Sequence, residues 1–441
     1  MVSDELDQIL ISWNQPNSGE KMHQLQTALM DMAMFEPESD NGKSVLDIVC
    51  RVGLEGDHAL VDYTKRFDGV GITVGQLRVA KEDMEKAHRN IDRDLLKSLR
   101  QAIQNVREYQ SEIFIGDRVH PGIRYTPLRR VGVCVPGASA PLPSTVIMTV
   151  VPAQVAGVGE IAVVSPPRYK GDIHPVILAV CHELGIEEVY RIGGAQAVAA
   201  LAVGTNTVRK VDKIVGPGNK WVQTAKKMVS GLVVGYDSVA GPSEVLIVAN
   251  DQANPAWLAA DMLSQAEHNP GCAVLFTDSK AIAEKTLDQL KKQVMRLRRG
   301  EETSKCLREF SKIVVFESMD EAVKWANYFA SEHLQIQCGD KSREIAESIE
   351  NAGAIFIGEY SPVATGDYWA GPSHTLPTGT SARFSSALTS NDFIKSISII
   401  EYSAEQLAAS AEDIIRLAEV EGLDAHARSI RIRQSLSDVP V

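Results

Sequence analysis

The sequence has few cysteines, and their spacing excludes two classes of protein. The six cysteines are scattered along 441 residues without any C-x-x-C pair. This distribution argues against a disulfide-stabilised secreted domain and against a zinc site made of thiolates. A long apolar run is also absent, because the most apolar stretch, residues 145–164, is interrupted by Pro152 and Glu160. A membrane helix needs roughly 20 apolar residues, so we expect no membrane-spanning segment.

Basic residues are outnumbered by acidic ones. Lys and Arg number 45 against 57 Asp and Glu, which gives a formal net charge of −12. This balance offers no electrostatic reason to expect a nucleic acid or an anionic membrane as partner. The first five residues include Asp4 and Glu5 and no basic residue, whereas a secretory signal is basic and then apolar. We therefore predict a cytoplasmic protein, and the chain is long enough for about three domains.

The fold class follows from the alternation of strand and helix patterns. Residues 45–109 have the apolar spacing of helices. After residue 129, short β-branched runs bounded by Gly and Pro alternate with Ala-rich helical patterns, which is typical of βαβ units and parallel sheets. The expected strands form two series: 131–135, 161–164, 189–192 and 213–215, then 245–248, 273–276, 313–316 and 354–357. We predict an α/β protein with two doubly wound, Rossmann-like sheets and helical N- and C-terminal segments.

A dinucleotide-binding G-x-G-x-x-G motif between a strand and a helix is missing. Two other glycine-containing turns leave expected strands, Gly193-Gly194-Ala195-Gln196 and Gly216-Pro217-Gly218-Asn219. Each ends in an amide side chain at the start of an expected helix, where backbone amides bind phosphate readily. Tight β-to-α turns without a ligand are the alternative for each one alone. The two together favour a nucleotide site.

The four histidines beyond His182 each lie in a compact polar motif. The first motif ends a helix that Asn254 is expected to cap, and it contains Gln265 and His268. Residues three apart share a helix face, so these two side chains can bind one ion. A solvated last turn, with a histidine favoured by the helix dipole, is the alternative.

The other three motifs contain acid–base and metal-binding side chains. Glu332 and His333 are adjacent, and they are the two residue types most readily tuned to accept protons near neutral pH. Asp367 lies in the Gly- and Pro-rich segment 366–374, which is expected to be a loop and which ends in His374. The segment 421–426 has a glycine break that brings Glu421 and His426 together. Exposed polar pairs or loops are the alternatives in each case.

Gln265, His268, Asp367 and His426 form a plausible nitrogen and oxygen ligand set for Zn²⁺ or another divalent first-row metal. Their spacing matches no standard zinc signature. The metal site is therefore inferred from the types of donor atoms alone.

Taken together, the motifs resemble the histidinol dehydrogenase family over essentially the whole chain. No single motif is decisive, but their joint occurrence in this order is highly specific. The matching segments are 130–137, 139–145, 193–197, 216–219, 240–244, 264–268, 332–334, 366–374 and 421–426.

The resemblance implies an NAD-dependent, Zn²⁺-dependent enzyme that oxidises L-histidinol through L-histidinal to L-histidine. Two NAD⁺ and one water are consumed in these last steps of histidine biosynthesis. His333 would be the base of the alcohol steps, and Glu332 would activate the water that attacks the aldehyde. The resemblance further implies that the metal is bound by Gln265, His268, Asp367 and His426.

The substrate would be held by Ser243, His374 and Glu421, together with His333 and the metal ligands. The resemblance implies a homodimer in which the partner subunit donates Glu421 and His426. Gln196 and Asn219 match the NAD positions of the family. The implied domains are an N-terminal helical segment (1–30), a metal and substrate domain (31–129 with 237–385), a Rossmann-like NAD domain (130–236) and a C-terminal helical dimerisation tail (386–441).

Three positions depart from the family pattern. Cys134 stands where the family usually has a tyrosine that contacts the nucleotide, and Ala138 stands in a loop that usually reads G-G-S. Both lie in the expected NAD site, so these differences bear on cofactor affinity. Ser331 replaces the usual proline before Glu332.

Three other functions compete with this interpretation. A paralogue in the same fold would oxidise a different primary alcohol, although Ser243, His374 and Glu421 argue against it. A thiol-dependent aldehyde dehydrogenase would use Cys134 as its nucleophile. A non-catalytic nucleotide- or metal-binding protein would have no use for Glu332 and His333.

Overall fold

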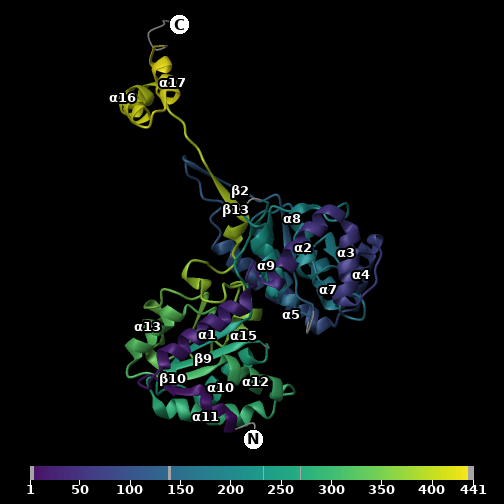
Figure 1. The fold of residues 1–441 in the computed structure, drawn as a ribbon, viewed down its shortest axis with the longest axis vertical. Coiled ribbons are helices and arrows are strands. Elements are labelled where there is room, and N and C mark those ends of the chain that lie inside the picture. The colour runs from purple at the N-terminus through teal and green to yellow at the C-terminus, as the bar shows by residue number, and fades with distance from the viewer. Residues whose placement is uncertain (1–3, 138–140, 232, 269, 436–441) are drawn as a thin grey trace. The chain divides into compact units, whose positions relative to one another are not determined.

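The computed structural model describes residues 4–137, 141–231, 233–268 and 270–435 (Figure 1). The chain divides into two compact units. The first comprises residues 1–116 and 127–394, and the second comprises residues 117–126 and 395–441. None of the helices in the described ranges is long and apolar enough to cross a membrane.

The first unit contains a parallel sheet of six strands in the order β1-β10-β9-β8-β11-β12. All residues of β8, β9 and β11 are buried, which is expected for parallel strands that are covered on both faces. Four of its strands confirm the second predicted series. The strands are β1 (Leu10–Ser12), β8 (Glu244–Ala249), β9 (Cys272–Thr277), β10 (Lys312–Val315), β11 (His333–Gln337) and β12 (Ala354–Ile357).

Helices cover both faces of this sheet. One face packs on α10, α11 and α12, and the other packs on α1 and α13, so that two apolar layers enclose the strands. Asn254 caps α10 by accepting a hydrogen bond from the Ala256 backbone N–H, as the sequence predicts. The helices are α1 (Ser18–Ala33), α10 (Pro255–Ala266), α11 (Lys280–Val294), α12 (Gly300–Phe310), α13 (Met319–Phe329), α14 (Ser342–Glu347) and α15 (Val363–Tyr368).

A second parallel sheet, of five strands in the order β5-β4-β3-β6-β7, follows the Rossmann-like pattern. Its four longer strands confirm the first predicted series. The elements are β3 (Arg130–Cys134), α6 (Pro143–Val155), β4 (Glu160–Val164), α7 (Pro175–Glu183), β5 (Glu188–Tyr190), α8 (Gly194–Val203), β6 (Lys213–Val215), α9 (Lys220–Val229) and β7 (Gly235–Tyr236).

The helices that precede this sheet in the sequence pack on it. Apolar side chains of α2 and α3 join the core around α8, and those of α4 and α5 join the core around α6 and α7. The family resemblance implies that these helices belong with residues 237–385, and the domain boundaries stay a prediction. The helices are α2 (Asp40–Glu55), α3 (Asp57–Tyr63), α4 (Lys81–Asn90) and α5 (Arg93–Glu112).

The N-terminal segment is helical in part and also supplies a strand. β1 pairs with β10 in parallel, with Leu10 opposite Ile313, and it lies at the edge of the six-stranded sheet. A strand of three residues is too short to show a period, so the sequence predicted only helix there. The overall class, α/β with two parallel sheets and helical segments at both ends, is confirmed.

The second unit consists mainly of two helices, α16 (Ala404–Val420) and α17 (Asp424–Ser435). Ser403 and Gln406 form the predicted capping box at the start of α16. Gly422 has a φ of 71°, a conformation that glycine adopts without strain, and it separates the two helices as predicted. Strands β2 (Ile123–Pro127) and β13 (Ile394–Ser398) form a two-stranded sheet where the two units join in sequence.

Candidate active site

The acid–base residues lie at the amino ends of the central strands of the six-stranded sheet. Glu332 immediately precedes β11 and Glu244 begins β8, and the two strands pair in parallel with His333 opposite Val245. Ligands of open α/β sheets usually bind at the carboxyl ends of strands. This site therefore lies at the opposite end of the strands from the usual ligand site, and its side chains alone identify it.

The Glu332 carboxylate is fixed by hydrogen bonds from the adjoining strand. Its Oε2 accepts one bond from the Ser243 hydroxyl at 2.7 Å and another from the Glu244 backbone N–H at 2.8 Å. The Glu332 carbonyl accepts a bond from the Ala354 backbone N–H of β12 at 2.9 Å. Glu332 is buried, and both its main chain and its side chain have defined partners.

The His333 imidazole is held next to this carboxylate. Nδ1 donates to the Glu244 backbone carbonyl at 3.0 Å and lies 3.3 Å from Glu332 Oε2. In the neutral ring, this arrangement places the proton on Nδ1 and leaves Nε2 as the free nitrogen. Burial alone would lower the pKa of His333. The charge and hydrogen bond of Glu332, the charge of Asp367 and the Glu244 carbonyl together outweigh burial and raise the pKa to about 9.

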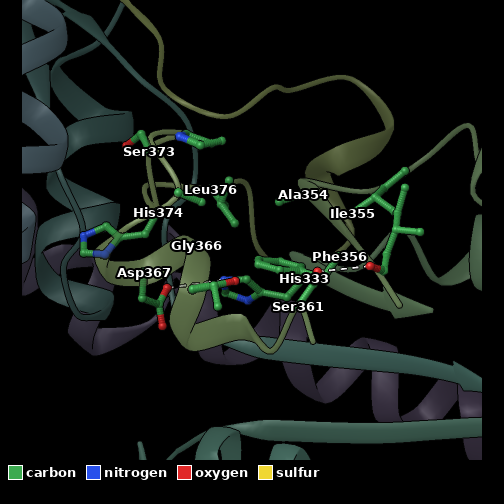
Figure 2. Close-up of a pocket in the computed structure, with 14 residues that line it drawn as sticks. His333, Ala354, Ile355, Phe356, Ser361, Gly366, Asp367, Ser373, His374 and Leu376 are labelled. Carbon is green, nitrogen blue, oxygen red and sulfur yellow. Dashed lines mark hydrogen bonds and ion pairs between the residues drawn. The ribbon is translucent and has the colours of Figure 1, made fainter. Parts of the chain in front are cut away.

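Asp367 and His333 line the same cavity. Figure 2 shows the two side chains pointing toward each other. His333 Nε2 lies 3.8 Å from Asp367 Oδ1. The cavity has a volume of about 200 Å³ and an apolar wall that includes Ile355, Phe356 and Leu376. An imidazole and a carboxylate thus face one small cavity, and His333 Nε2 is buried without a hydrogen-bond partner in the described part of the chain.

The segment that carries Asp367 differs from the expected loop. Residues 363–368 form the short helix α15, so Asp367 lies on a helical turn, and only the following residues are irregular. His374 lines the same cavity, but its ring points away from His333 (Figure 2). Its Nε2 is 3.3 Å from the Thr145 hydroxyl of α6, and burial lowers the pKa of this imidazole.

The prediction that Gln265 and His268 share a helix face is wrong. Helix α10 ends at Ala266, Gln265 is buried, and His268 lies beyond the helix and is exposed. Gln265 Nε2 is one of the buried polar atoms that have no hydrogen-bond partner among the described residues. In those residues, no group of three or more His, Cys, Asp or Glu side chains is arranged to bind a metal.

Glu421 and His426 both belong to the second unit. Glu421 follows α16 as its C-cap, and His426 lies in the first turn of α17. Both side chains are exposed.

The two predicted glycine turns lie at the carboxyl ends of β5 and β6, at the starts of α8 and α9. A Cβ at Gly193 would lie 2.7 Å from Pro166, and one at Gly216 would lie 2.4 Å from the Cys134 carbonyl oxygen. Only glycine therefore fits this close approach of the backbone. Asn219 caps α9 by accepting from the Val222 backbone N–H at 3.3 Å. The buried Gln196 occupies the corresponding first turn of α8.

The thiol of Cys134 is unsuited to nucleophilic catalysis. Cys134 ends β3 and is only 6% exposed, and burial raises the pKa of its thiol to about 11. A reactive cysteine needs a lowered pKa and access to substrate. This observation opposes the thiol-dependent alternative, in which Cys134 was the nucleophile. Its neighbours Ala138 to Ala140 lie outside the described residues.

Sequence reasoning missed the groups that support the two sites. Glu244 lies in the matching segment 240–244, but no role was predicted for it. In the structure it contacts both Glu332 and His333. Lys226 and Asp237 form a buried ion pair at 2.5 Å, and both bind the backbone of Gly216. The available signal was the presence of charged residues in apolar segments, which are rarely fully buried unless paired.

Comparison with known proteins finds similar sequences and a similar solved structure. A family model for histidinol dehydrogenase matches residues 35–434. Histidinol dehydrogenase of Rhodopirellula baltica is 47% identical over 397 residues, which are 88% of this chain and 86% of that protein. The enzyme of a Synechococcus strain is 44% identical, covering 90% of this chain and 92% of its own. The crystal structure of histidinol dehydrogenase from Elizabethkingia anophelis matches with a TM-score of 0.88 and 32% identity over 98% of each chain.

The chain belongs to the histidinol dehydrogenase family. Membership confirms the resemblance inferred from the motifs. It makes the chain an oxidoreductase that oxidises histidinol in histidine biosynthesis. The individual roles of the site residues stay predictions, which the contacts described above support to different degrees.

Proposed function

We propose that the chain carries out both oxidations of the histidinol dehydrogenase reaction at the cavity that His333 and Asp367 line. L-histidinol is oxidised to L-histidinal and then to L-histidine. The observation that carries this proposal is the buried Glu332–His333 pair, because one member suits each half of the reaction. A cytoplasmic location remains a prediction from the sequence.

His333 is the base of the alcohol steps. In the neutral ring, which becomes more populated as pH rises toward the pKa of about 9, the Nδ1 proton is committed to the Glu244 carbonyl. Nε2 then faces the cavity and accepts the proton of the substrate hydroxyl. The cavity wall of Ile355, Phe356 and Leu376 limits the access of water to this nitrogen. The imidazole then acts close to a carboxylate, which stabilises the protonated form that results.

Glu332 is the base of the aldehyde-to-acid step. Both of its described side-chain hydrogen bonds fall on Oε2, so Oε1 is available to accept a proton from the attacking water. Ser243 keeps the carboxylate oriented, and it is also a proposed substrate contact. His374 and Glu421 are proposed to bind the polar groups of the amino alcohol.

NAD is proposed to bind at the turns that follow β5 and β6. When bound, NAD⁺ supplies the hydride acceptor for each oxidation. The close backbone approach at Gly193 and Gly216 and the amide side chains of Gln196 and Asn219 suit a nucleotide. Cys134 is proposed as a weaker cofactor contact than the tyrosine usual at this position, because its thiol is small and buried.

Zinc is proposed as the second cofactor, with Gln265, His268, Asp367 and His426 as ligands. When bound, Zn²⁺ supplies a Lewis acid that anchors and polarises the substrate. The donor types suit this metal, and the buried amide of Gln265 has a nitrogen without a hydrogen-bond partner in the described ranges. Turning this amide over would direct its oxygen into the unpaired position.

A homodimer would complete the site, with Glu421 and His426 supplied by the partner subunit. The second unit exposes apolar side chains close to these residues in the sequence: Leu417 is 66% exposed and Val420 is 83% exposed. An apolar surface of this kind is typical of a subunit contact. This observation supports an intersubunit role for the helical tail.

Mixing two inactive variants tests the exchange of residues between subunits. His333→Ala and His426→Ala subunits are mixed, unfolded and refolded together. If His426 acts in the partner's site, half of the dimers are mixed and each has one intact site. Activity then returns to about a quarter of the wild-type value. No recovery, with mixed dimers shown to form, would contradict the exchange.

Substrate competition tests the reaction itself. Zinc-loaded protein is given NAD⁺ with L-histidinol or with other primary amino alcohols, and NADH is followed by absorbance. We expect L-histidinol to be preferred and a chelator to stop the reaction, with zinc restoring it. A greater kcat/KM for another alcohol would instead favour the paralogue.

A further inference from the structure

Glu244 is a buried carboxyl group without an assigned role. It begins β8, has no exposed surface, and lies beside the acid–base pair. Its side-chain Oε1 accepts a hydrogen bond from the Glu332 backbone N–H at 3.1 Å. In return, its own backbone N–H donates to Glu332 Oε2 at 2.8 Å. The two glutamates therefore hold each other through reciprocal bonds between side chain and main chain.

The backbone of Glu244 also orients the histidine. Its carbonyl oxygen accepts the Nδ1 hydrogen bond of His333 at 3.0 Å. The three contacts connect one residue of β8 to the main chain and side chain of Glu332 and to the ring of His333. A residue with these contacts determines where both chemical groups point.

Burial favours the protonated form of the Glu244 carboxyl group. Burial raises its pKa to about 8, and the nearby carboxylate of Glu332 contributes to the increase. The other groups that face it are His333, the Gly379 backbone and the thiol of Cys272 on β9. Oε2 of Glu244 has no hydrogen-bond partner in the described residues. A second negative charge here would repel the carboxylate of Glu332, so the neutral acid suits the site.

We propose that Glu244 is a positioning residue that holds Glu332 and His333 in their reactive orientations. This inference rests on the function proposed above. Its side chain contacts the backbone of Glu332, whereas His333 is bound by its main-chain carbonyl. Loss of the side chain therefore disturbs Glu332 more than His333, and the second oxidation suffers more than the first.

Three substitutions distinguish the effect of the position of the Glu244 acceptor oxygen from the effect of its charge. Glu244→Gln keeps the acceptor oxygen and is permanently uncharged. Glu244→Asp keeps the ionisable group but is one methylene shorter, and Glu244→Ala removes both. Each variant is assayed with L-histidinol and with L-histidinal, and kcat and KM are determined for each substrate. The matched control is Glu160→Gln, since Glu160 also begins a parallel strand but pairs with Arg130 in the other sheet.

The glutamine variant is expected to retain wild-type kcat within about threefold. The aspartate and alanine variants are expected to lose about 10²-fold in kcat with L-histidinal, because a displacement of about 1 Å has an effect of this size. Their loss with L-histidinol is smaller, and KM changes little. A merely structural role would lower the amount of folded enzyme without separating the two half-reactions.

Two results overturn the proposal. One is full activity of the soluble aspartate variant together with an inactive glutamine variant, which would show that the charge matters. The other is equal kinetics in wild type and glutamine, aspartate and alanine variants. If alanine fails to fold, the comparison of glutamine with aspartate still decides. Failure of the wild-type protein to oxidise L-histidinol would instead contradict the proposed function.

Discussion

Replacement of Glu332 by glutamine separates the two oxidations. The substitution preserves size, and the amide oxygen can still accept the bonds from the Ser243 hydroxyl and the Glu244 backbone N–H. The site therefore keeps its shape while losing its base. Since Glu332 is assigned only to the step that uses water, the alcohol-to-aldehyde step should be largely preserved.

The size of the effect follows from the loss of one general base. Such a group contributes about 10²- to 10⁴-fold, which is about 3 to 5 kcal/mol in the activation free energy. We expect Glu332→Gln to slow the oxidation of L-histidinal by this factor. The oxidation of L-histidinol to the aldehyde should change by less than about 10-fold, because His333 keeps its bond to the Glu244 carbonyl.

The assay measures each half-reaction on its own. Rapid mixing of L-histidinol with NAD⁺ reports the first NADH, and L-histidinal supplied directly reports the second. Glu347→Gln, a change of an exposed glutamate on α14, is the control for surface charge and should match wild type. An equal decrease in both half-reactions of Glu332→Gln would refute the division of roles between Glu332 and His333.

Further predictions concern the base, stability, pH and the thiol. His333→Asn should lower the rate of histidinol oxidation by about 10²- to 10⁴-fold, measured as initial NADH formation. Lys226→Met leaves Asp237 buried without its cation, so it should lower the free energy of unfolding by about 3 to 5 kcal/mol in denaturant titration. The folded-state pKa of Glu244, about 8, exceeds the ordinary 4.5, so its contribution to stability is complete below pH 4.5 and is lost as pH rises toward 8. The decrease in Tm over that range should be smaller in Glu244→Gln. Iodoacetamide should leave activity intact because Cys134 is buried, and inactivation through that residue would restore the thiol mechanism.

The parallel sheets could be predicted because their strands are almost wholly apolar. Buried strands such as β8 and β9 appear in the sequence as β-branched runs between helical patterns. β1 was missed because three residues are too few to establish a period. Which sheet the helices α2 to α5 cover depends on contacts between distant segments, and no local pattern contains that information.

The site was predictable where its residues are adjacent in sequence. Glu332 and His333 were recognised as a pair and are in contact. The role of Glu244 was not visible, because it depends on the register between β8 and β11, which lie 88 residues apart at this contact. The prediction of a shared helix face for Gln265 and His268 was wrong. The spacing argument assumes that the helix continues, whereas α10 ends at Ala266.

The most direct test of the account is the ratio of NADH to L-histidine formed from L-histidinol. Purified, zinc-loaded protein is incubated with L-histidinol and excess NAD⁺, and both products are quantified at several times. The proposed pair of oxidations predicts two NADH for each histidine throughout. Formation of NADH without histidine, or no NADH from L-histidinol, would contradict the assignment of both steps to this site.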